Sequence, residues 1–400
     1  MAVMAGAGGG DLSPDLQQWQ PIRVVSASHQ INFPDGIELR LTATADADIS
    51  EVTVYYRVGG GDASVYGYPE FESSTEIEST FTFATSGQSY IPPGVDIEYY
   101  YVIKDVAGNS LETEPFTLEY LDPTYQWQRM YVGDLELLWH DRPRRLVGDV
   151  AADVIERSRA AKQLLGISSP TPMKAVILNS FVETSKSFPN VSEAASEGHV
   201  YGGFALGEFD TFVLGSLSVD GMVHEMTHLY VDEAIEGPGV RVPSWLNEGL
   251  AMYFESGPRG RDRILARAAV GNRLIPLRSM GAVPGRPDDI RTFYAQSWSI
   301  VRYLIDGHGE EGMSDLLAEI GDGAPVEAAV QTVYGKSLEE IDAEWRNSLA
   351  RRTSLFPRPD PGTFGTSMLI GAAMAAAMLA VGFRWLKRLV RPPDVEDTEL

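Results

Sequence analysis

The chain contains no cysteine among its 400 residues, and only six histidines. Disulfide bonds, catalytic thiols and zinc sites built on cysteine are therefore excluded. The absence is compatible with oxidising and reducing compartments alike, so it does not locate the protein. The few histidines are unevenly placed, because two of them stand four residues apart in the stretch VDGMVHEMTHLYVDEA, residues 219–234.

Basic residues are also few, 32 against 56 acidic residues, which gives a formal net charge of −24. Nucleic acid is therefore not an expected partner, because phosphate binding needs a positive surface. Hydrophobic residues make up 44% and charged residues 22%, as in ordinary globular proteins. A chain of this length predicts two or three domains. Oligomeric state does not follow from the sequence.

Residues 21–122 predict an all-β sandwich, after an N-terminal segment, residues 1–20, that we expect to be disordered. Short runs rich in β-branched and aromatic residues alternate with turn signals such as PDG, GGGD and PPG. The stretch YIPPGVDIEYYYVIKDVAGN resembles immunoglobulin-like or fibronectin-type modules, which indicates a spacer or adhesion module. The predicted strands are residues 37–45, 52–59, 77–85 and 97–105.

Residues 125–350 predict an α+β domain, because strands come first and helices dominate afterwards. Apolar residues show helical spacing over 146–167, up to Gly166. The predicted strands are residues 131–141, 173–180, 200–207 and 211–216.

The motif HEMTH, residues 224–228, fits the pattern His-Glu-x-x-His. On a helix, His224 and His228 lie on one face and can bind one metal ion from adjacent turns. No proline or glycine interrupts the stretch from Met222 to Glu236, which favours a helix. The alternative is a pair of unrelated surface histidines.

A third ligand is needed if a zinc ion is to keep an open catalytic position. Glu248 follows His228 by twenty residues and lies in PSWLNEGLAMYFE, whose apolar spacing predicts a second helix. If the two helices pack together, its carboxylate can reach the ion. The alternative is a solvated glutamate.

HEMTH followed by WLNEGLA resembles the gluzincin metallopeptidases of the peptidase MA clan, over about residues 195–350. The similarity is strongest to peptidase MA-like domains of membrane-anchored bacterial proteins, which carry a downstream Tyr-x-Gln-Ser run. The resemblance implies a zincin-like fold that binds one Zn²⁺ through His224, His228 and Glu248. It also implies that Glu225 is the catalytic base in the hydrolysis of a peptide or protein substrate.

The developing oxyanion needs a hydrogen-bond donor besides the metal. Tyr294, in FYAQSWSIVRYL, is the candidate, and the alternative is a tyrosine in the core. His199 and Tyr201 are weaker candidates. The strand within 200–207 or 211–216 is expected to bind an extended substrate along its edge.

The sequence departs from the family at two places. The WLNEG wording resembles the aminopeptidase N branch, whose members carry a Gly-Ala-Met-Glu-Asn type segment ahead of the zinc helix. This chain reads YGGFALGEFD there, so we expect an endopeptidase. Thermolysin-like enzymes place an aspartate four residues after the glutamate ligand, where this chain has Met252. Another group must then orient the histidines, and Asp232 is one candidate.

Residues 363–383 carry no charge and are long enough for a transmembrane helix. The alternative is a buried helix at the end of a soluble domain. A proline-rich linker, residues 351–362, precedes the segment, and a basic tail, residues 384–400, follows it. Such basic clusters stay cytoplasmic, which predicts a single-pass protein of the cell membrane with its catalytic domain outside and lipid contacts through 363–383.

Export requires a signal peptide, and the first residues, MAVMAGAGGGDLSPDL, lack its basic start and apolar run. We expect that this signal is missing or trimmed. The alternative, a tail-anchored cytosolic protein, would move the basic tail across the membrane.

Two functions are compatible with these features. The first is a membrane-anchored zinc endopeptidase with a β-sandwich spacer. The second is a catalytically silent zinc-binding adhesion or interaction protein. The intact Glu225 favours the first, because a structural zinc site needs no base.

Overall fold

The computed structural model describes residues 20–61, 64–188, 202–235, 240–257 and 260–354. The chain divides into two compact units, residues 1–342 and 343–400. The sheets and most of the described helices belong to the first unit.

The N-terminal part consists of two antiparallel sheets that share one hydrophobic core. Alternation of apolar and polar residues produces this arrangement, as in β6, where Ile97, Tyr99, Tyr101 and Ile103 are buried. The predicted strands at 37–45, 52–59, 77–85 and 97–105 are β2, β3, β5 and β6. One sheet contains β1 (Ile22–Asn32), β2 (Gly36–Ala45) and β5 (Glu76–Ala84); the other contains β4 (Val65–Gly67), β3 (Ile49–Val58), β6 (Asp96–Asp105), β7 (Ser110–Glu112) and β8 (Phe116–Glu119).

The following part begins with a mixed sheet in the order β12-β13-β11-β10-β9. Its three central strands are parallel and its two edge strands are antiparallel to their neighbours. The single strand predicted at 131–141 is two strands, because the chain turns at Gly133, where φ is 63°. The strands are β9 (Gln128–Val132), β10 (Leu135–Trp139), β11 (Met173–Ile177), β12 (Gly203–Leu206) and β13 (Thr211–Leu214), with helices α1 (Arg144–Leu164) and α2 (Phe181–Ser187) between them.

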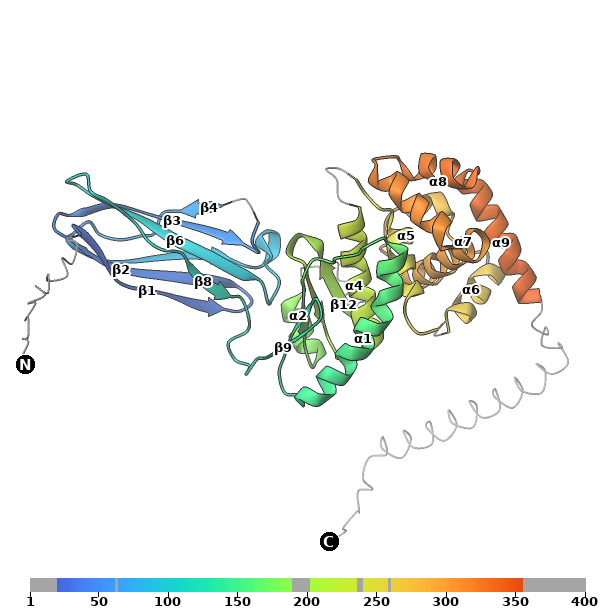
Figure 1. The fold of residues 1–400 in the computed structure, drawn as a ribbon, viewed down its shortest axis with the longest axis horizontal. Helices are drawn as coiled ribbons and strands as arrows, with labels where there is room; N and C mark the ends of the chain where they lie inside the picture. The colour runs from blue at the N-terminus through green and yellow to red at the C-terminus, as the bar shows by residue number, and fades with distance from the viewer. Residues whose placement is uncertain (1–19, 62–63, 189–201, 236–239, 258–259, 355–400) are drawn as a thin grey trace, which may run out of the picture. The chain divides into compact units, whose positions relative to one another are not determined.

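Helices make up the rest of the described chain. Helix α4 (Val219–Ala234) packs against β12, β13 and α1, and α5 (Ser244–Tyr253) packs against α4 and α7. Figure 1 shows α4 and β12 side by side. The other helices are α6 (Arg261–Val270), α7 (Pro287–Gly321), which is interrupted at Gly309, α8 (Val326–Tyr334) and α9 (Leu338–Ser354).

The order of β-sheets followed by a helix-rich part agrees with the prediction, but its membrane component is wrong. None of the helices in the described ranges is long and apolar enough to cross a bilayer. The two longest, α1 and α7, carry charged residues throughout their length. The lack of such a helix among the described residues overturns the assignment to a single-pass membrane protein. The predicted span itself, residues 363–383, lies outside the described residues.

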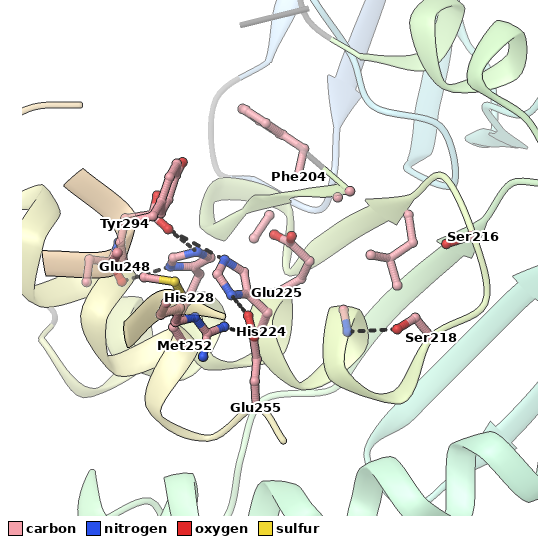
Figure 2. Close-up of a pocket in the computed structure, with 18 of the residues that line it drawn as sticks. Phe204, Ser216, Ser218, His224, Glu225, His228, Glu248, Met252, Glu255 and Tyr294 are labelled. Carbon is pink, nitrogen blue, oxygen red and sulfur yellow. Dashed lines mark hydrogen bonds and ion pairs between the residues drawn. The ribbon is translucent and has the colours of Figure 1, made fainter. Parts of the chain in front are cut away.

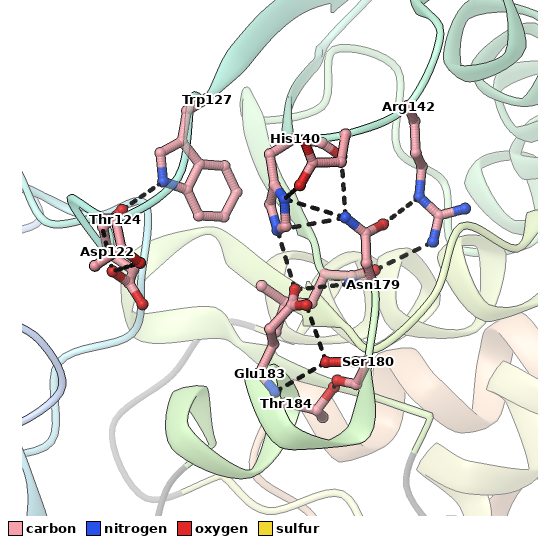
Figure 3. Close-up of polar contacts among 11 residues, drawn as sticks. Asp122, Thr124, Trp127, His140, Arg142, Asn179, Ser180, Glu183 and Thr184 are labelled. Atoms are coloured by element: carbon pink, nitrogen blue, oxygen red, sulfur yellow. Dashed lines mark hydrogen bonds and ion pairs between the residues drawn. The ribbon is translucent and has the colours of Figure 1, made fainter.

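A polar network joins α2 to the ends of β10 and β11 (Figure 3). Its centre is His140, which is 1% exposed and stacks on Tyr125 with ring centroids 4.1 Å apart. Nδ1 of His140 lies 2.9 Å from Asp141 Oδ2, and Nε2 lies 3.0 Å from Glu183 Oε2. Glu183 also accepts a hydrogen bond from the backbone N–H of Asn179. The network therefore fixes α2 to the carboxyl ends of two parallel strands.

His140→Ala is expected to lower the free energy of unfolding by roughly 2–4 kcal/mol, because it removes one hydrogen bond of the largely buried Glu183 and opens a cavity. The matched control is Asp141→Asn, since Asp141 is 79% exposed and an exposed pair contributes less than about 1 kcal/mol. Urea unfolding followed by tryptophan fluorescence measures both. Equal effects of the two substitutions would contradict the central position of His140.

Candidate metal centre

The two histidines of HEMTH lie on one face of α4. Ser218 caps the helix, because its side chain accepts a hydrogen bond from the backbone N–H of Gly221. The opposite face is apolar and buried, so the helix is fixed against the sheet and α1. The buried apolar residues are Met222, Val223, Met226, Leu229, Tyr230 and Val231. This packing directs His224 and His228 into a cleft.

Glu248 reaches the same cleft from α5. Trp245, Leu246 and Leu250 are buried on this helix, as its apolar spacing predicts. Next to Glu248, a Cβ atom on Gly249 would lie only 2.5 Å from the carbonyl oxygen of Ser297 on α7. The glycine is therefore required for the close approach of α5 to α7, which sets the position of the carboxylate.

The three predicted ligands come together (Figure 2). Oε2 of Glu248 lies 3.5 Å from Nε2 of His224 and 3.7 Å from Nε2 of His228, and one donor atom from each residue lies within 4.8 Å of the others. Among the described residues, Oε2 of Glu248 is buried and has no hydrogen-bond partner. An unmatched buried carboxylate oxygen is costly. A cation between these three atoms would remove that cost, so the donor set fits a metal ion.

Each imidazole is oriented by a hydrogen bond at Nδ1. His224 donates from Nδ1 to Glu255 Oε1 at 2.9 Å, and His228 donates from Nδ1 to Asn247 Oδ1 at 2.9 Å. These bonds fix the tautomers that leave each Nε2 free to bind a metal. Arg261 pairs with Glu255 in turn and donates to the carbonyl oxygen of Gly257 at 3.0 Å.

The groups that orient the histidines differ from the sequence-based candidate. Asp232 lines the cleft, but no hydrogen bond joins it to an imidazole in the described part of the chain; burial raises its pKa. Met252, at the position of the thermolysin-type aspartate, also lines the cleft. Asn247 and Glu255 take this place, one residue before and seven residues after the glutamate ligand. Both residues lie in the PSWLNEGLAMYFE stretch, and this closeness to Glu248 in the sequence is the feature that could have identified them.

The charged groups of the centre shift one another's pKa values. Burial opposes protonation of His224, yet the carboxylates of Glu248 and Glu255 raise its pKa to about 10. Burial lowers the pKa of His228. Burial acts to raise the pKa of Glu248, but the two imidazoles and the hydroxyl of Tyr294 together lower it. The carboxylates therefore favour positive charge at this centre, as a site for a cation requires.

Glu225 lies beside this cluster, 6% exposed, on the side away from Tyr294 (Figure 2). Burial, together with the charge of Glu248, raises its pKa to about 7, although the neighbouring His224 and the backbone N–H of Ala205 oppose the shift. A Cβ atom on Gly203 would lie 2.6 Å from Oε1 of Glu225. Glycine at this position thus lets β12 approach the carboxylate.

Tyr294 lines the cleft from α7 and donates a hydrogen bond to the carboxylate of Glu248. It is the first residue of the Tyr-x-Gln-Ser run, whose other members are structural. Gln296 binds both the backbone N–H and the carbonyl of Ile275, at 2.7 and 2.9 Å. Ser297 provides the backbone carbonyl that Gly249 approaches. His199 and Tyr201, the other predicted donors, lie outside the described residues.

The cleft has a volume of about 740 Å³. Its walls are β12 on one side and α4, α5 and the start of α7 on the others, so residues distant in sequence meet in one concave site. Such a cleft is large enough for several side chains of a peptide.

Residues 196–351 match the family model described as Peptidase MA superfamily. This match supports a zincin-like peptidase domain in this part of the chain. No curated protein matches the sequence.

Solved structures similar to the chain include a mutant of a two-domain M1 zinc metallopeptidase bound to L-arginine. The match has 13% identity and a TM-score of 0.38, and it covers 82% of this chain and 94% of that chain. Another is an aminopeptidase N family protein from Idiomarina loihiensis, with 10% identity, 83% and 73% covered, and a TM-score of 0.32. A family 56 carbohydrate-binding module that binds β-1,3-glucan has 19% identity, 24% and 96% covered, and a TM-score of 0.17.

Glu255→Ala is expected to weaken zinc binding by about 10–100-fold, because His224 loses the carboxylate that fixes its tautomer. The measurement is the zinc dissociation constant, by competition with a chromogenic chelator. Glu156→Ala is the control, since Glu156 is exposed on α1 and pairs only with Arg159 among the described residues. An unchanged dissociation constant for Glu255→Ala would show that His224 needs no such partner.

Proposed function

We propose that the chain is a zinc-dependent peptidase that hydrolyses internal peptide bonds. The observation that carries the proposal is the convergence of His224, His228 and Glu248 in a cleft that also contains the buried Glu225. Two nitrogens and one carboxylate oxygen form a donor set that zinc accepts, and three protein ligands leave a position open for catalysis. Zinc, when bound, would act as a Lewis acid that makes water nucleophilic near neutral pH.

Glu225 is the proposed general base. Its carboxylate lies next to the cluster and is buried, and burial raises its pKa to about 7. A carboxylate placed beside the ligand set can accept the proton of an attacking water and release it again. Glu225 would take the proton of the attacking water at a carboxylate oxygen and pass it to the leaving amine.

Tyr294 is the proposed donor to the oxyanion. Its hydroxyl already reaches the carboxylate of Glu248, so it lies at the edge of the ligand set and opposite Glu225 (Figure 2). A donor placed there stabilises negative charge that develops on the carbonyl oxygen.

The strand β12 is the proposed binding edge for the substrate backbone. It lies at the end of its sheet, with β13 as its only partner among the described strands. An extended peptide can pair with such an edge. Residues 202–205 line the cleft, so the scissile bond of a peptide paired there would lie near Glu225.

The carboxylates of the cleft favour endopeptidase action. An aminopeptidase needs a carboxylate for the free amino group of its substrate. Glu248 belongs to the ligand set, Glu255 is paired with His224 and Arg261, and Glu225 is the proposed base. The fourth carboxylate, Asp232, packs against Gly207, on which a Cβ atom would lie 2.3 Å from Oδ2. Among the carboxylates that line the cleft in the described part of the chain, three thus have other partners or roles, and the fourth lies against β12 and its following turn.

Glu225→Gln in the full chain is expected to retain one zinc per chain and to lose casein cleavage by about 100-fold or more, because a general base typically contributes roughly 10²–10⁴-fold. Zinc content by mass spectrometry and cleavage are measured side by side on the wild type and the variant. Zinc in both with no cleavage in either would favour the alternative role, a silent zinc-binding interaction protein. No zinc in either would contradict the metal centre itself.

Tyr294→Phe is expected to lower kcat about 100-fold while KM and zinc content stay within about twofold, because a lost oxyanion donor acts on the transition state. Steady-state kinetics on a fluorogenic peptide measure the effect. Tyr253→Phe is the matched control, since Tyr253 lies on α5 and does not line the cleft. A kcat within a few fold of wild type would assign Tyr294 to packing alone.

A further inference from the structure

A second cavity, of about 470 Å³, adjoins the proposed catalytic cleft. Four arginines from three segments line it: Arg263 and Arg267 of α6, Arg273 of the loop that follows, and Arg291 of α7. We refer to it as the arginine cavity. Ile264 and Arg291 line both spaces, so the cavity and the cleft are neighbours.

This concentration of positive charge is unusual in an acidic chain. Residues 257–291 contain eight arginines and three aspartates, whereas the whole chain has a net charge of −24. Neighbouring arginines have carboxylate partners, Glu255 for Arg261 and Glu339 for Arg278. Within the described ranges, no ion pair is made by any of the four arginines of the cavity.

The four arginines are exposed, and the fold anchors the backbone that carries them around the cavity. Arg263 and Arg267 are four residues apart and lie on one face of α6, where like charges destabilise a helix. After α6 the chain turns at Asn272, with φ of 51°, and the backbone N–H of Arg273 donates to Ala268 at 2.8 Å. Gln296 then fixes Ile275 to α7. The loop is therefore anchored on both sides of Arg273.

Arg291 connects the cavity to the chemistry. It lies three residues before Tyr294 on α7, so both side chains lie on one face of that helix. A peptide whose reacting carbonyl is near Tyr294 could thus extend one of its own groups towards the guanidinium groups. Guanidinium groups bind carboxylates through paired, charge-assisted hydrogen bonds.

We propose that the arginine cavity binds a carboxylate of the substrate, so that the peptidase prefers peptides with an acidic group close to the scissile bond. This proposal rests on the proposed function, because it takes the ligand of the cavity to be a peptide substrate. The acidic surface elsewhere repels such peptides, which makes the cavity the local site where they are attracted. The carboxylate can come from an aspartate or glutamate side chain or from the C-terminus of the peptide.

The experiment compares kcat/KM for fluorogenic peptides that contain glutamate or glutamine at matched positions, each with a free or an amidated C-terminus. The wild type is expected to favour the acidic peptide by about tenfold in kcat/KM. Each exposed ion pair contributes less than this factor, so several arginines must act together on one carboxylate. Arg267→Gln combined with Arg273→Gln should reduce this preference to about twofold. Arg145→Gln combined with Arg159→Gln, both exposed on α1, is the charge-matched control and should retain it.

A binding measurement separates this proposal from the proposed function. Fluorescence anisotropy follows the labelled acidic peptide on full-length Glu225→Gln protein, with and without the two arginine substitutions. Weaker binding of the arginine variant supports the cavity even if no peptide is cleaved. Cleavage that ignores the charge of the peptide, or binding that the substitutions leave unchanged, overturns the cavity while the peptidase stands. A preference that follows only the free C-terminus identifies the terminal carboxylate as the ligand.

Discussion

The site depends on the carboxylate of Glu248, whose buried Oε2 lies against two imidazoles without a hydrogen bond. An ionised carboxylate in such a place is stable only beside positive charge. The carboxylates of Glu248 and Glu255 raise the pKa of His224 to about 10, so the cluster favours positive charge. The hydrogen bonds that the two imidazoles donate to Asn247 and Glu255 hold them in the orientation that a cation requires.

Packing between helices sets this arrangement. The carboxylate reaches the imidazoles because α5 lies close to α7, and it can do so because Gly249 faces the backbone of Ser297. A larger residue at Gly249 would separate the two helices and move Glu248 and Tyr294 apart, since they are carried by α5 and α7. The small residue beside the ligand thus belongs to the chemistry of the site as much as to its core.

Local patterns were enough to predict some of these features. HEMTH and the apolar spacing around it predict α4, and WLNEGLA predicts α5 with Glu248 one turn inside it. The roles of Asn247 and Glu255 depend on how α5 packs against α4, which the spacing of apolar residues does not show. Spacing along α4 alone favours Asp232, one turn after His228. The arginine cavity combines three segments that meet only in the folded chain. The membrane assignment failed because composition and flanking charge were its only basis, and no described helix supports it.

Helix α6 connects the metal centre with the arginine cavity. Its first residue, Arg261, is 8% exposed, pairs with Glu255 behind His224 and stacks over Trp298 with 5.5 Å between its guanidinium carbon and the ring centroid. Two and six residues later, Arg263 and Arg267 line the cavity. A shift of this helix would therefore disturb the support of an imidazole and the position of the guanidinium groups together. The orientation of the imidazole and the recognition of substrate charge would then depend on one helix. A carboxylate bound in the cavity would help to hold that helix, and with it the metal centre, in place.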